Sequence, residues 1–277
     1  MTWNAVVAAL DDGDTFQSSV SLYLHPLAGR PIFWHALLAL AATEPRPRSV
    51  RVLHRAAAPV LLPDGFPVPL TAEAVDAGTE LVSLRAAVTP AGLTMLVDGA
   101  APLISASTIA RLLRAAERGM VSLSAGGEDA ICAAVAGEGP ALASADDPRR
   151  PHGAVPVAAT APEEVIRVID RHTLADAALA IHDRLIRRHE GAGVSFVLPA
   201  TIWVDADVVI GPDTVIYPGA VLEGQTRIGS ECVIGPYTRL IDATLGRGVE
   251  LKGWNYVART SVRNHAVLEP YVRRGFD

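Results

Sequence analysis

An aliphatic residue returns at every sixth position over much of the C-terminal part of the chain. The first such positions are Val204, Ile210, Ile216, Leu222, Ile228, Ile234 and Leu240. The spacing then shortens by one residue, and the pattern continues at Leu245, Leu251, Val257, Val262 and Leu268. A fixed period of this kind indicates short strands stacked into a β-solenoid. A β-sandwich with Gly-rich turns is the alternative, but its strands would not keep an unbroken six-residue spacing.

Each six-residue unit is expected to form one brief strand and one turn, with its aliphatic side chain pointing into a narrow interior. Three units would close one triangular coil, so the pattern predicts about four coils. The outer faces of such a prism are free to pack on copies of the same chain.

Composition limits the classes of partner. The chain has 277 residues, half of them apolar, which is enough for two domains with cores of their own. A net charge of −6 and the lack of a basic stripe argue against a nucleic-acid partner. The sequence shows neither a secretion signal nor an apolar stretch of membrane-spanning length, so we expect a cytoplasmic protein without membrane association. Cys132 and Cys232 lie in different halves of the chain and are expected to be buried thiols.

Residues 1–170 alternate between predicted strands and helices. Strands are expected at 5–10, 49–54 and 93–97, and helices at 32–42 and 105–118. This order predicts a mostly parallel sheet with helices on both faces. Ligands bind beyond the carboxyl ends of the strands in such sheets, which directs attention to the segments after Ala9 and Val97.

A helix is predicted between the two domains. Leu174, Ala178, Ile181 and Leu185 form one apolar stripe, and Gly191 and Gly193 follow it. The expected organisation is therefore an α/β domain at 1–170, a connector helix at 171–192 and the hexapeptide-repeat solenoid at 193–277.

Three stretches of the chain resemble a known family. LHPLAGRPIFWHALLAL, at 24–40, resembles the sugar-1-phosphate nucleotidyltransferases, and residues 168–224 resemble the connector and early solenoid of the bifunctional GlmU-type N-acetylglucosamine-1-phosphate uridyltransferases. MLVDGAAPLISASTIARLLRAA, at 95–116, is more similar to the methylerythritol-phosphate cytidylyltransferases, which share the fold.

The resemblance implies a Rossmann-like nucleotidyltransferase domain followed by a short left-handed parallel β-helix. It also implies a homotrimer assembled about the solenoid. Candidates for the faces between chains are the aromatic residues Trp203, Tyr217, Trp254 and Tyr256.

The family's phosphate-binding loop is altered in this chain. The family has Ala-Ala-Gly-x-Gly-Thr-Arg-Met after its first strand, and here Ala8 and Ala9 are followed by Leu10-Asp11-Asp12-Gly13-Asp14. No Arg or Lys occurs between Met1 and Gly29, and the only lysine of the chain is Lys252. Carboxylates repel a triphosphate, so transfer of a nucleotidyl group looks impaired. The nucleotide-binding candidates that remain by the resemblance are Ala8, Ala9, Gly13, Gly78 and Thr79, although a Gly-Thr pair can also simply open a helix.

The family uses Mg²⁺ to hold the phosphates, and two aspartates are candidates for binding it. Asp98 takes the metal position in the cytidylyltransferase alignment, whereas Ala100 takes it in the uridyltransferase alignment. Asp170 lies beside Ile169, which stands where the family has a metal-binding Asn. For both aspartates the alternative is a strand-end or helix-capping role.

Two functions remain open. The first is a degenerate nucleotidyltransferase that serves as a binding, regulatory or assembly subunit, with a nucleotide or sugar phosphate and another protein as partners. The alternative is an active Mg²⁺-dependent enzyme that makes a nucleotide-sugar from a nucleoside triphosphate and a sugar 1-phosphate, without acetyltransferase activity. The altered loop and the short segment between Ser124 and Val168 favour the first.

Overall fold

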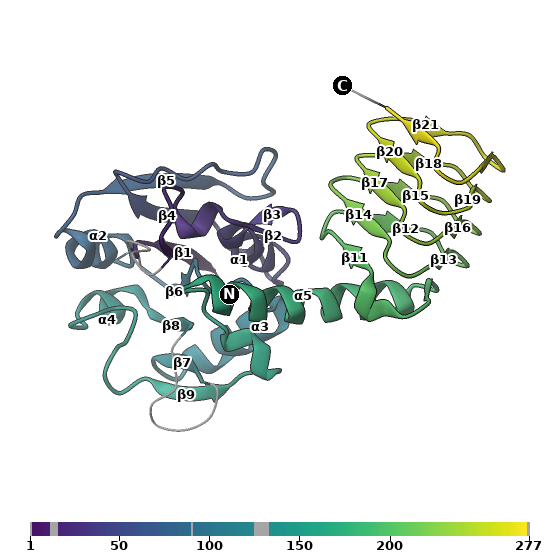
Figure 1. Cartoon of the computed structure of the whole chain (residues 1–277). Coiled ribbons are helices and arrows are strands. Elements are labelled where there is room, and N and C mark those ends of the chain that lie inside the picture. Colours follow the sequence, from purple (N-terminus) through teal and green to yellow (C-terminus); the bar gives the residue numbers. More distant parts are fainter. Residues whose placement is uncertain (1, 12–15, 90, 125–132, 276–277) are drawn as a thin grey trace. The chain divides into compact units, whose positions relative to one another are not determined.

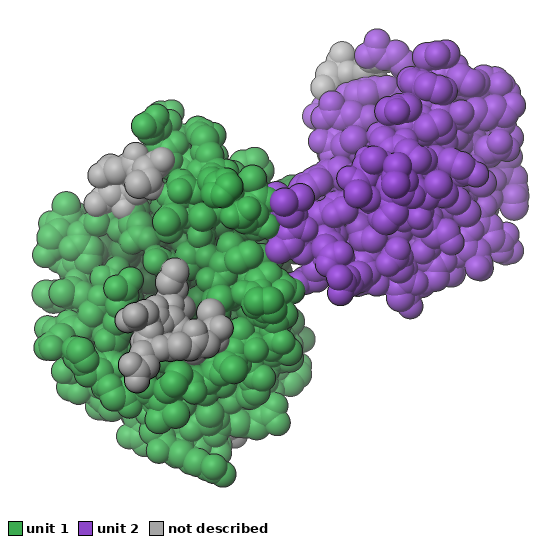
Figure 2. Space-filling model, turned by 60° about the horizontal axis from the view of Figure 1, so that its bottom comes forward, with its two compact units in different colours: residues 1–177 green, residues 178–277 purple. Residues whose placement is uncertain are grey.

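The computed structural model describes residues 2–11, 16–89, 91–124 and 133–275. It divides into two compact units, residues 1–177 and residues 178–277 (Figure 2). The division falls inside helix α5 (Arg171–Gly191), which lies where the sequence predicts the connector.

The described part of unit 1 is built on a seven-stranded sheet in the order β5-β4-β1-β6-β8-β7-β9 (Figure 1). Its strands are β1 (Trp3–Ala9), β4 (Val50–Arg55), β5 (Leu70–Val75), β6 (Leu93–Asp98), β7 (Val121–Ser124), β8 (Ala134–Glu138) and β9 (Val155–Ala158). β5, β4, β1 and β6 are parallel, whereas β8 runs antiparallel to both of its neighbours. The predicted mostly parallel sheet is confirmed, and strands β5, β7, β8 and β9 are additions to it.

Helices cover both faces of this sheet, as predicted (Figure 1). One face carries α1 (Ile32–Ala41) and α3 (Ala106–Ala116), and the other carries α2 (Glu80–Ala87) and α4 (Gly139–Ala143). Side chains alternate along a strand, so Val6, Ala8 and Leu10 share one face and belong to the apolar cluster that includes Leu84 of α2 and Leu142 of α4. Shorter elements are η2 (Leu22–Leu24), β2 (Pro26–Leu27), β3 (Arg30–Pro31) and η3 (Pro162–Val165).

Unit 2 is a parallel β-helix with three sheets (Figure 1). The first contains β10 (Ser195–Phe196), β13 (Val215–Ile216), β16 (Val233–Ile234), β19 (Glu250–Leu251) and β22 (Val267–Leu268). The second contains β11 (Trp203–Val204), β14 (Val221–Glu223), β17 (Arg239–Ile241), β20 (Tyr256–Ala258) and β23 (Arg273–Arg274). The third contains β12 (Val209–Ile210), β15 (Arg227–Ile228), β18 (Thr244–Leu245) and β21 (Ser261–Val262). A further turn, η4 (Pro199–Thr201), precedes β11.

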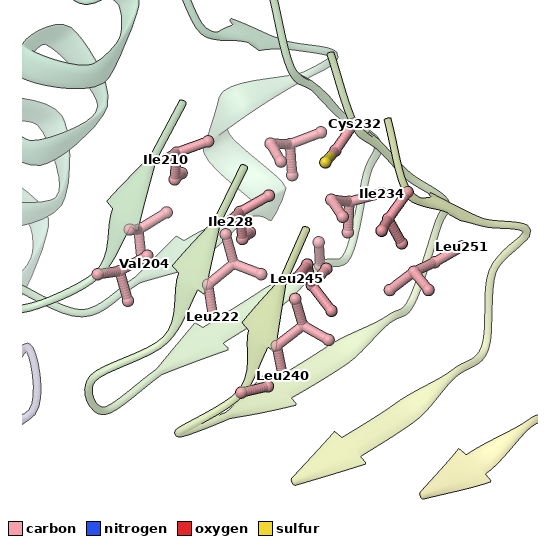
Figure 3. Close-up of a cluster of buried hydrophobic side chains, with 14 of the residues drawn as sticks. Val204, Ile210, Leu222, Ile228, Cys232, Ile234, Leu240, Leu245 and Leu251 are labelled. Carbon is pink, nitrogen blue, oxygen red and sulfur yellow. The ribbon is translucent and has the colours of Figure 1, made fainter. Parts of the chain in front are cut away.

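The repeating aliphatic positions form the interior of this helix (Figure 3). All twelve positions identified in the sequence are buried, with at most 5% of any residue exposed. The shortened spacing after Leu240 is absorbed at one corner: Ile210 pairs with Ile228 one coil later, eighteen residues on, whereas Leu245 pairs with Val262, seventeen residues on. The coil therefore loses one turn residue while each strand keeps its inward-facing side chain.

One corner of the solenoid carries a stack of aromatic rings. Tyr237, Trp254 and Tyr271 occupy equivalent places in successive coils, and their ring centroids lie 5.6 and 5.7 Å apart. All three have positive φ angles, which bulky residues seldom adopt. The preceding coil has Gly219 at this corner, with φ +74°, where a Cβ atom would lie 2.5 Å from the ring of Tyr237.

The four aromatic residues named as interface candidates differ in exposure. Tyr217 and Trp254 are exposed. Trp203 is partly buried and donates a hydrogen bond from Nε1 to Asp205 (2.9 Å), and Tyr256 lies under the guanidinium group of Arg273. Assembly into a trimer stays a prediction.

Two expectations from composition concern the described residues. No described helix has the length and apolar character needed to cross a bilayer. Cys232 is buried in the solenoid, as predicted, and Cys132 lies outside the described residues.

Candidate functional site

A charged cavity lies beyond the carboxyl ends of β1 and β6, where the fold predicts a ligand site. Its volume is about 340 Å³. Three acidic and three basic side chains line it together with Ile169: Asp11, Asp98, Asp147, Arg149, Arg150 and Arg167. The opposite charges of these side chains balance, in contrast to the excess of carboxylates that the first thirty residues predict.

Asp98 is the last residue of β6 and lies opposite Ala8 of β1. Both of its carboxylate oxygens accept hydrogen bonds: Oδ1 from the backbone N–H of Ala100 (2.8 Å) and Oδ2 from Nε of Arg167 (2.5 Å). Burial raises the pKa of the Asp98 carboxyl, and the guanidinium group of Arg167 and the Ala100 N–H only partly oppose this rise. The carboxylate is thus held by donors of its own chain.

Arg167 reaches Asp98 because the backbone beside it is fixed. The N–H of Val168 donates to the carbonyl oxygen of Ala100 (2.8 Å), which places residue 167 next to the end of β6. The guanidinium Nη2 lies 2.5 Å from Asp98 Oδ2 and 3.2 Å from Asp11 Oδ2. One arginine therefore bridges carboxylates that follow two neighbouring strands.

Tyr23 supports this bridge through packing and a hydrogen bond. Its ring packs where a Cβ atom on Gly99 would lie, at 3.3 Å, and its hydroxyl accepts the backbone N–H of Asp11 (3.1 Å). Burial, together with the charges of Asp98 and Asp11, raises the pKa of Tyr23 well above its usual value, so the phenol stays neutral.

A second ion pair completes the cavity wall. Arg149 binds both carboxylate oxygens of Asp147 through Nε and Nη2, at 2.9 to 3.2 Å. Burial works to raise the pKa of Asp147, but the hydrogen bonds from Arg149 outweigh it and the pKa is lowered. The neighbouring Arg150 is exposed, and no hydrogen bond or ion pair of its guanidinium group is found within the described residues.

An adjoining cavity of about 420 Å³ shares Asp11 with the first. It lies beyond β4 and β5, and Ser18, Ser19 and Ser21 contribute hydroxyl groups to its lining alongside Asp76. Asp11, Arg55 and Asp76 also line this cavity, so it combines neutral hydroxyl groups with charged side chains.

Gly78 and Thr79, two of the nucleotide-binding candidates from the sequence, follow this second cavity in the chain. The N–H of Gly78 donates to Oε1 of Glu80 (2.9 Å), and the hydroxyl of Thr79 donates to the carbonyl oxygen of Asp76 (2.8 Å). Thr79 stands at the N-cap position of α2 but makes no capping hydrogen bond with its side chain. Both polar groups are thus engaged within their own loop.

The remaining loop candidates fall into two groups. Ala8 and Ala9 are buried in β1, and Ala8 lies beside Asp98. Gly13, with Asp12 and Asp14, lies outside the described residues. Leu10 stands where the family has a glycine and is only 3% exposed in the apolar cluster, so it contributes to packing.

The aspartates proposed for Mg²⁺ are placed differently from each other. Asp98 lines the charged cavity, whereas Asp170 opens α5: its Oδ1 accepts hydrogen bonds from the backbone N–H and the hydroxyl of Thr173, both at 2.7 Å. No group of three His, Cys, Asp or Glu side chains suited to a metal ion is found among the described residues. Mg²⁺ requires about six oxygen ligands in near-octahedral geometry. The described residues do not fit such a site, and metal binding stays a prediction.

The lining residues that the sequence did not reveal are Asp147, Arg149, Arg150 and Arg167. All four are far in sequence from the altered loop, and no local pattern ties them to it. One signal was available, because Arg167 precedes Ile169 and Asp170, in a stretch that the resemblance already places at the site.

Comparison with known proteins identifies the C-terminal region. Residues 207–242 match the bacterial transferase hexapeptide family (six repeats). The bifunctional protein GlmU of Caldanaerobacter subterraneus subsp. tengcongensis is 38% identical over 109 residues, which cover 39% of this chain and 24% of that protein. GlmU of Mycolicibacterium gilvum is 47% identical over 90 residues, 32% of this chain and 18% of that protein. This region of the chain is GlmU-like. These matches confirm the resemblance of the C-terminal region and the predicted hexapeptide-repeat solenoid.

The chain matches only about a quarter of the length of the first GlmU relative, so the activity of the whole relative does not transfer with the GlmU-like region. Among solved structures, a nucleotidyl transferase from Methanothermobacter thermautotroptrophicus is similar with a TM-score of 0.48 and 19% identity, covering 68% of this chain and 99% of that one. A 2-C-methyl-D-erythritol 4-phosphate cytidylyltransferase from Thermus thermophilus is similar with a TM-score of 0.47 and 16% identity, covering 65% and 98%.

Proposed function

We propose that the protein is a non-catalytic, nucleotide-binding homologue of the sugar-nucleotide nucleotidyltransferases, with the GlmU-like solenoid as its assembly element. The observation that carries this proposal is the bridge between Asp11, Arg167 and Asp98. In this bridge, Arg167 occupies carboxylates that an enzyme transferring a nucleotidyl group would need free for binding a metal ion. Carboxylates that Arg167 already pairs are not available to hold a metal ion that stabilises charge developing during transfer, although the site can still bind a ligand.

The shape of the site supports binding of a nucleotide or sugar phosphate. The adjoining cavities of about 420 and 340 Å³ fall within the size range of small-molecule sites. The serine hydroxyl groups of the larger cavity, which Arg55 and Asp76 also line, suit a base or sugar, and the three arginines of the smaller cavity, Arg149, Arg150 and Arg167, suit phosphate.

The solenoid supports the assembly role. A short parallel β-helix has outer faces that can pack on copies of itself, and Tyr217 and Trp254 are exposed on them. We propose a homotrimer, with a further protein as partner.

One observation favours an active enzyme as the second candidate. Arg149, Arg150 and Arg167 bring positive charge to a site that the N-terminal sequence leaves without any. Arginine can stabilise a leaving pyrophosphate without a lysine in the loop. Under this alternative the protein would make a nucleotide-sugar from a nucleoside triphosphate and a sugar 1-phosphate.

Nucleotide binding is tested by calorimetric titration of the full chain with UTP, CTP and N-acetylglucosamine 1-phosphate. We expect at least one of them to bind, and Arg150→Met to weaken that binding by about tenfold because one charge-assisted hydrogen bond is lost. Arg150 is exposed, so the variant should fold normally.

Arg46→Met is the matched control, because Arg46 is exposed in the same unit and is absent from the lining of both cavities. It should bind like the wild type. If none of the three ligands binds, or if both variants weaken binding equally, the proposed site is wrong.

A further inference from the structure

Arg167 holds the two carboxylates that a divalent cation would need. Nε of this arginine donates a hydrogen bond to Asp98 Oδ2 (2.5 Å), Nη2 lies 2.5 Å from the same oxygen, and Nη2 also donates to Asp11 Oδ2 (3.2 Å). The arginine side chain is only 19% exposed and that of Asp98 only 17%. The contact is therefore part of the cavity wall and differs in this respect from a solvent-exposed surface pair.

A guanidinium group and a divalent cation exclude each other at this place. Mg²⁺ binds carboxylate oxygens at about 2.0 to 2.1 Å, but Asp98 Oδ2 already accepts a hydrogen bond from Nε of Arg167 and has Nη2 of the same group 2.5 Å away. A cation brought to the same oxygen would also face a permanent positive charge within a few ångströms, because arginine does not lose its proton in proteins. The occupied oxygen of Asp98 and the positive charge of Arg167 therefore both oppose binding of a divalent cation.

We propose that Arg167 permanently takes the place of the divalent cation, so that the site accepts a phosphorylated ligand without a metal ion. The part that concerns the ligand rests on the function proposed above; the exclusion of the cation does not. The phosphorylated group would be bound by arginine N–H groups that take no part in the ion pairs.

Such donors are present. Within the described residues, Nη1 of Arg167 takes part in no hydrogen bond, and neither does the guanidinium group of Arg150. Both residues line the charged cavity. Arg149 contributes its positive charge although Asp147 engages its Nε and Nη2. An oxyanion in the cavity would meet three arginines and no bound cation.

Cation exclusion is tested with Mn²⁺ alone, measured on the full chain by the electron paramagnetic resonance signal of the free ion. We expect no saturable site in the wild type that depends on Asp98. Arg167→Met should expose a site that binds Mn²⁺ at least about tenfold more tightly, because Asp98 and Asp11 lose their internal cation. Adding Asp98→Asn to that variant should abolish the gain.

Arg150→Met is the matched control, since it removes the same charge from the same cavity but frees no carboxylate. It should bind Mn²⁺ like the wild type. A wild-type site that Asp98→Asn removes would overturn the proposal, and so would a folded Arg167→Met variant that binds Mn²⁺ no better than the wild type.

A second measurement decides the matter if Arg167→Met does not fold. Wild-type protein is titrated with the nucleotide that binds best, once in EDTA and once with Mg²⁺, and the two dissociation constants should agree within about twofold. Binding that requires Mg²⁺ would overturn the inference while leaving the proposed function intact. Absence of binding in both buffers would instead reject the proposed function, and the wild-type Mn²⁺ titration would then decide on cation exclusion.

Discussion

Ile216→Asp is expected to unfold the solenoid. Ile216 is completely buried in β13 and pairs with Phe196 in the preceding coil and Ile234 in the next. A carboxylate at this position would have no partner inside the narrow apolar interior, which costs several kcal/mol. Loss of the aliphatic packing adds about 2 to 5 kcal/mol. Together these costs approach the whole stability of a domain of about one hundred residues.

Val209→Asp is the matched control. Val209 is a β-branched residue of β12 that immediately precedes the buried Ile210, but it is 50% exposed. The same substitution there should cost no more than about 1 kcal/mol. Urea unfolding followed by circular dichroism, with light scattering for assembly, measures both variants. A stable, normally assembled Ile216→Asp variant would contradict the assignment of Ile216 to the interior.

Arg167→Met is expected to destabilise unit 1 by roughly 3 to 5 kcal/mol at neutral pH, because it leaves Asp98 buried without its counter-charge. The loss should depend on pH. Burial already raises the pKa of Asp98, and removal of the guanidinium group raises it further. A carboxyl whose pKa is raised in the folded state lowers stability above that pKa, and this penalty disappears as the pH falls through it.

The difference in unfolding free energy between this variant and the wild type should therefore shrink as the pH falls from above the raised pKa of Asp98 toward the ordinary range of an aspartate. Denaturant unfolding at a series of pH values measures it. The double variant Arg167→Met/Asp98→Asn should regain part of the stability and lose the pH dependence. A deficit that stays constant with pH, or that the double variant leaves unchanged, would show that the arginine stabilises the fold through packing alone.

The solenoid could be predicted in detail because its rule is local. Each aliphatic anchor lies at a fixed interval from the last, and each occupies the interior whatever the rest of the chain does. Even the shortened spacing after Leu240 was visible in the sequence. The stack of Tyr237, Trp254 and Tyr271 was not, since nothing local signals that bulky residues will adopt positive φ angles at one corner.

In the sheet of unit 1, the strands that were predicted are those with a strong hydrophobic pattern. β1, β4 and β6 are apolar runs and were identified within one or two residues. β5 (Leu70–Val75) was missed because most of its side chains are exposed, and β7 to β9 because they are short and rich in small residues.

The candidate site was only half accessible from the sequence. Its location followed from the carboxyl ends of β1 and β6, and Asp98, a candidate from the sequence, lines the cavity there. Its charge did not follow, because Arg167 arrives from almost seventy residues away through a backbone contact between Val168 and Ala100. Leu10 shows a second limit of the sequence. It stands where the family has a glycine of the phosphate loop, but in the structure it packs in the apolar core.

Pyrophosphate release tests the central claim most directly. The purified full chain is incubated with Mg²⁺, a panel of nucleoside triphosphates and several sugar or polyol phosphates, beside an Asp98→Ala variant. We expect no release above the background of the variant with any combination of substrates, because the bridge between Arg167 and Asp98 keeps the cation position closed. Turnover by the wild type that disappears in Asp98→Ala would contradict this account and establish a working nucleotidyltransferase.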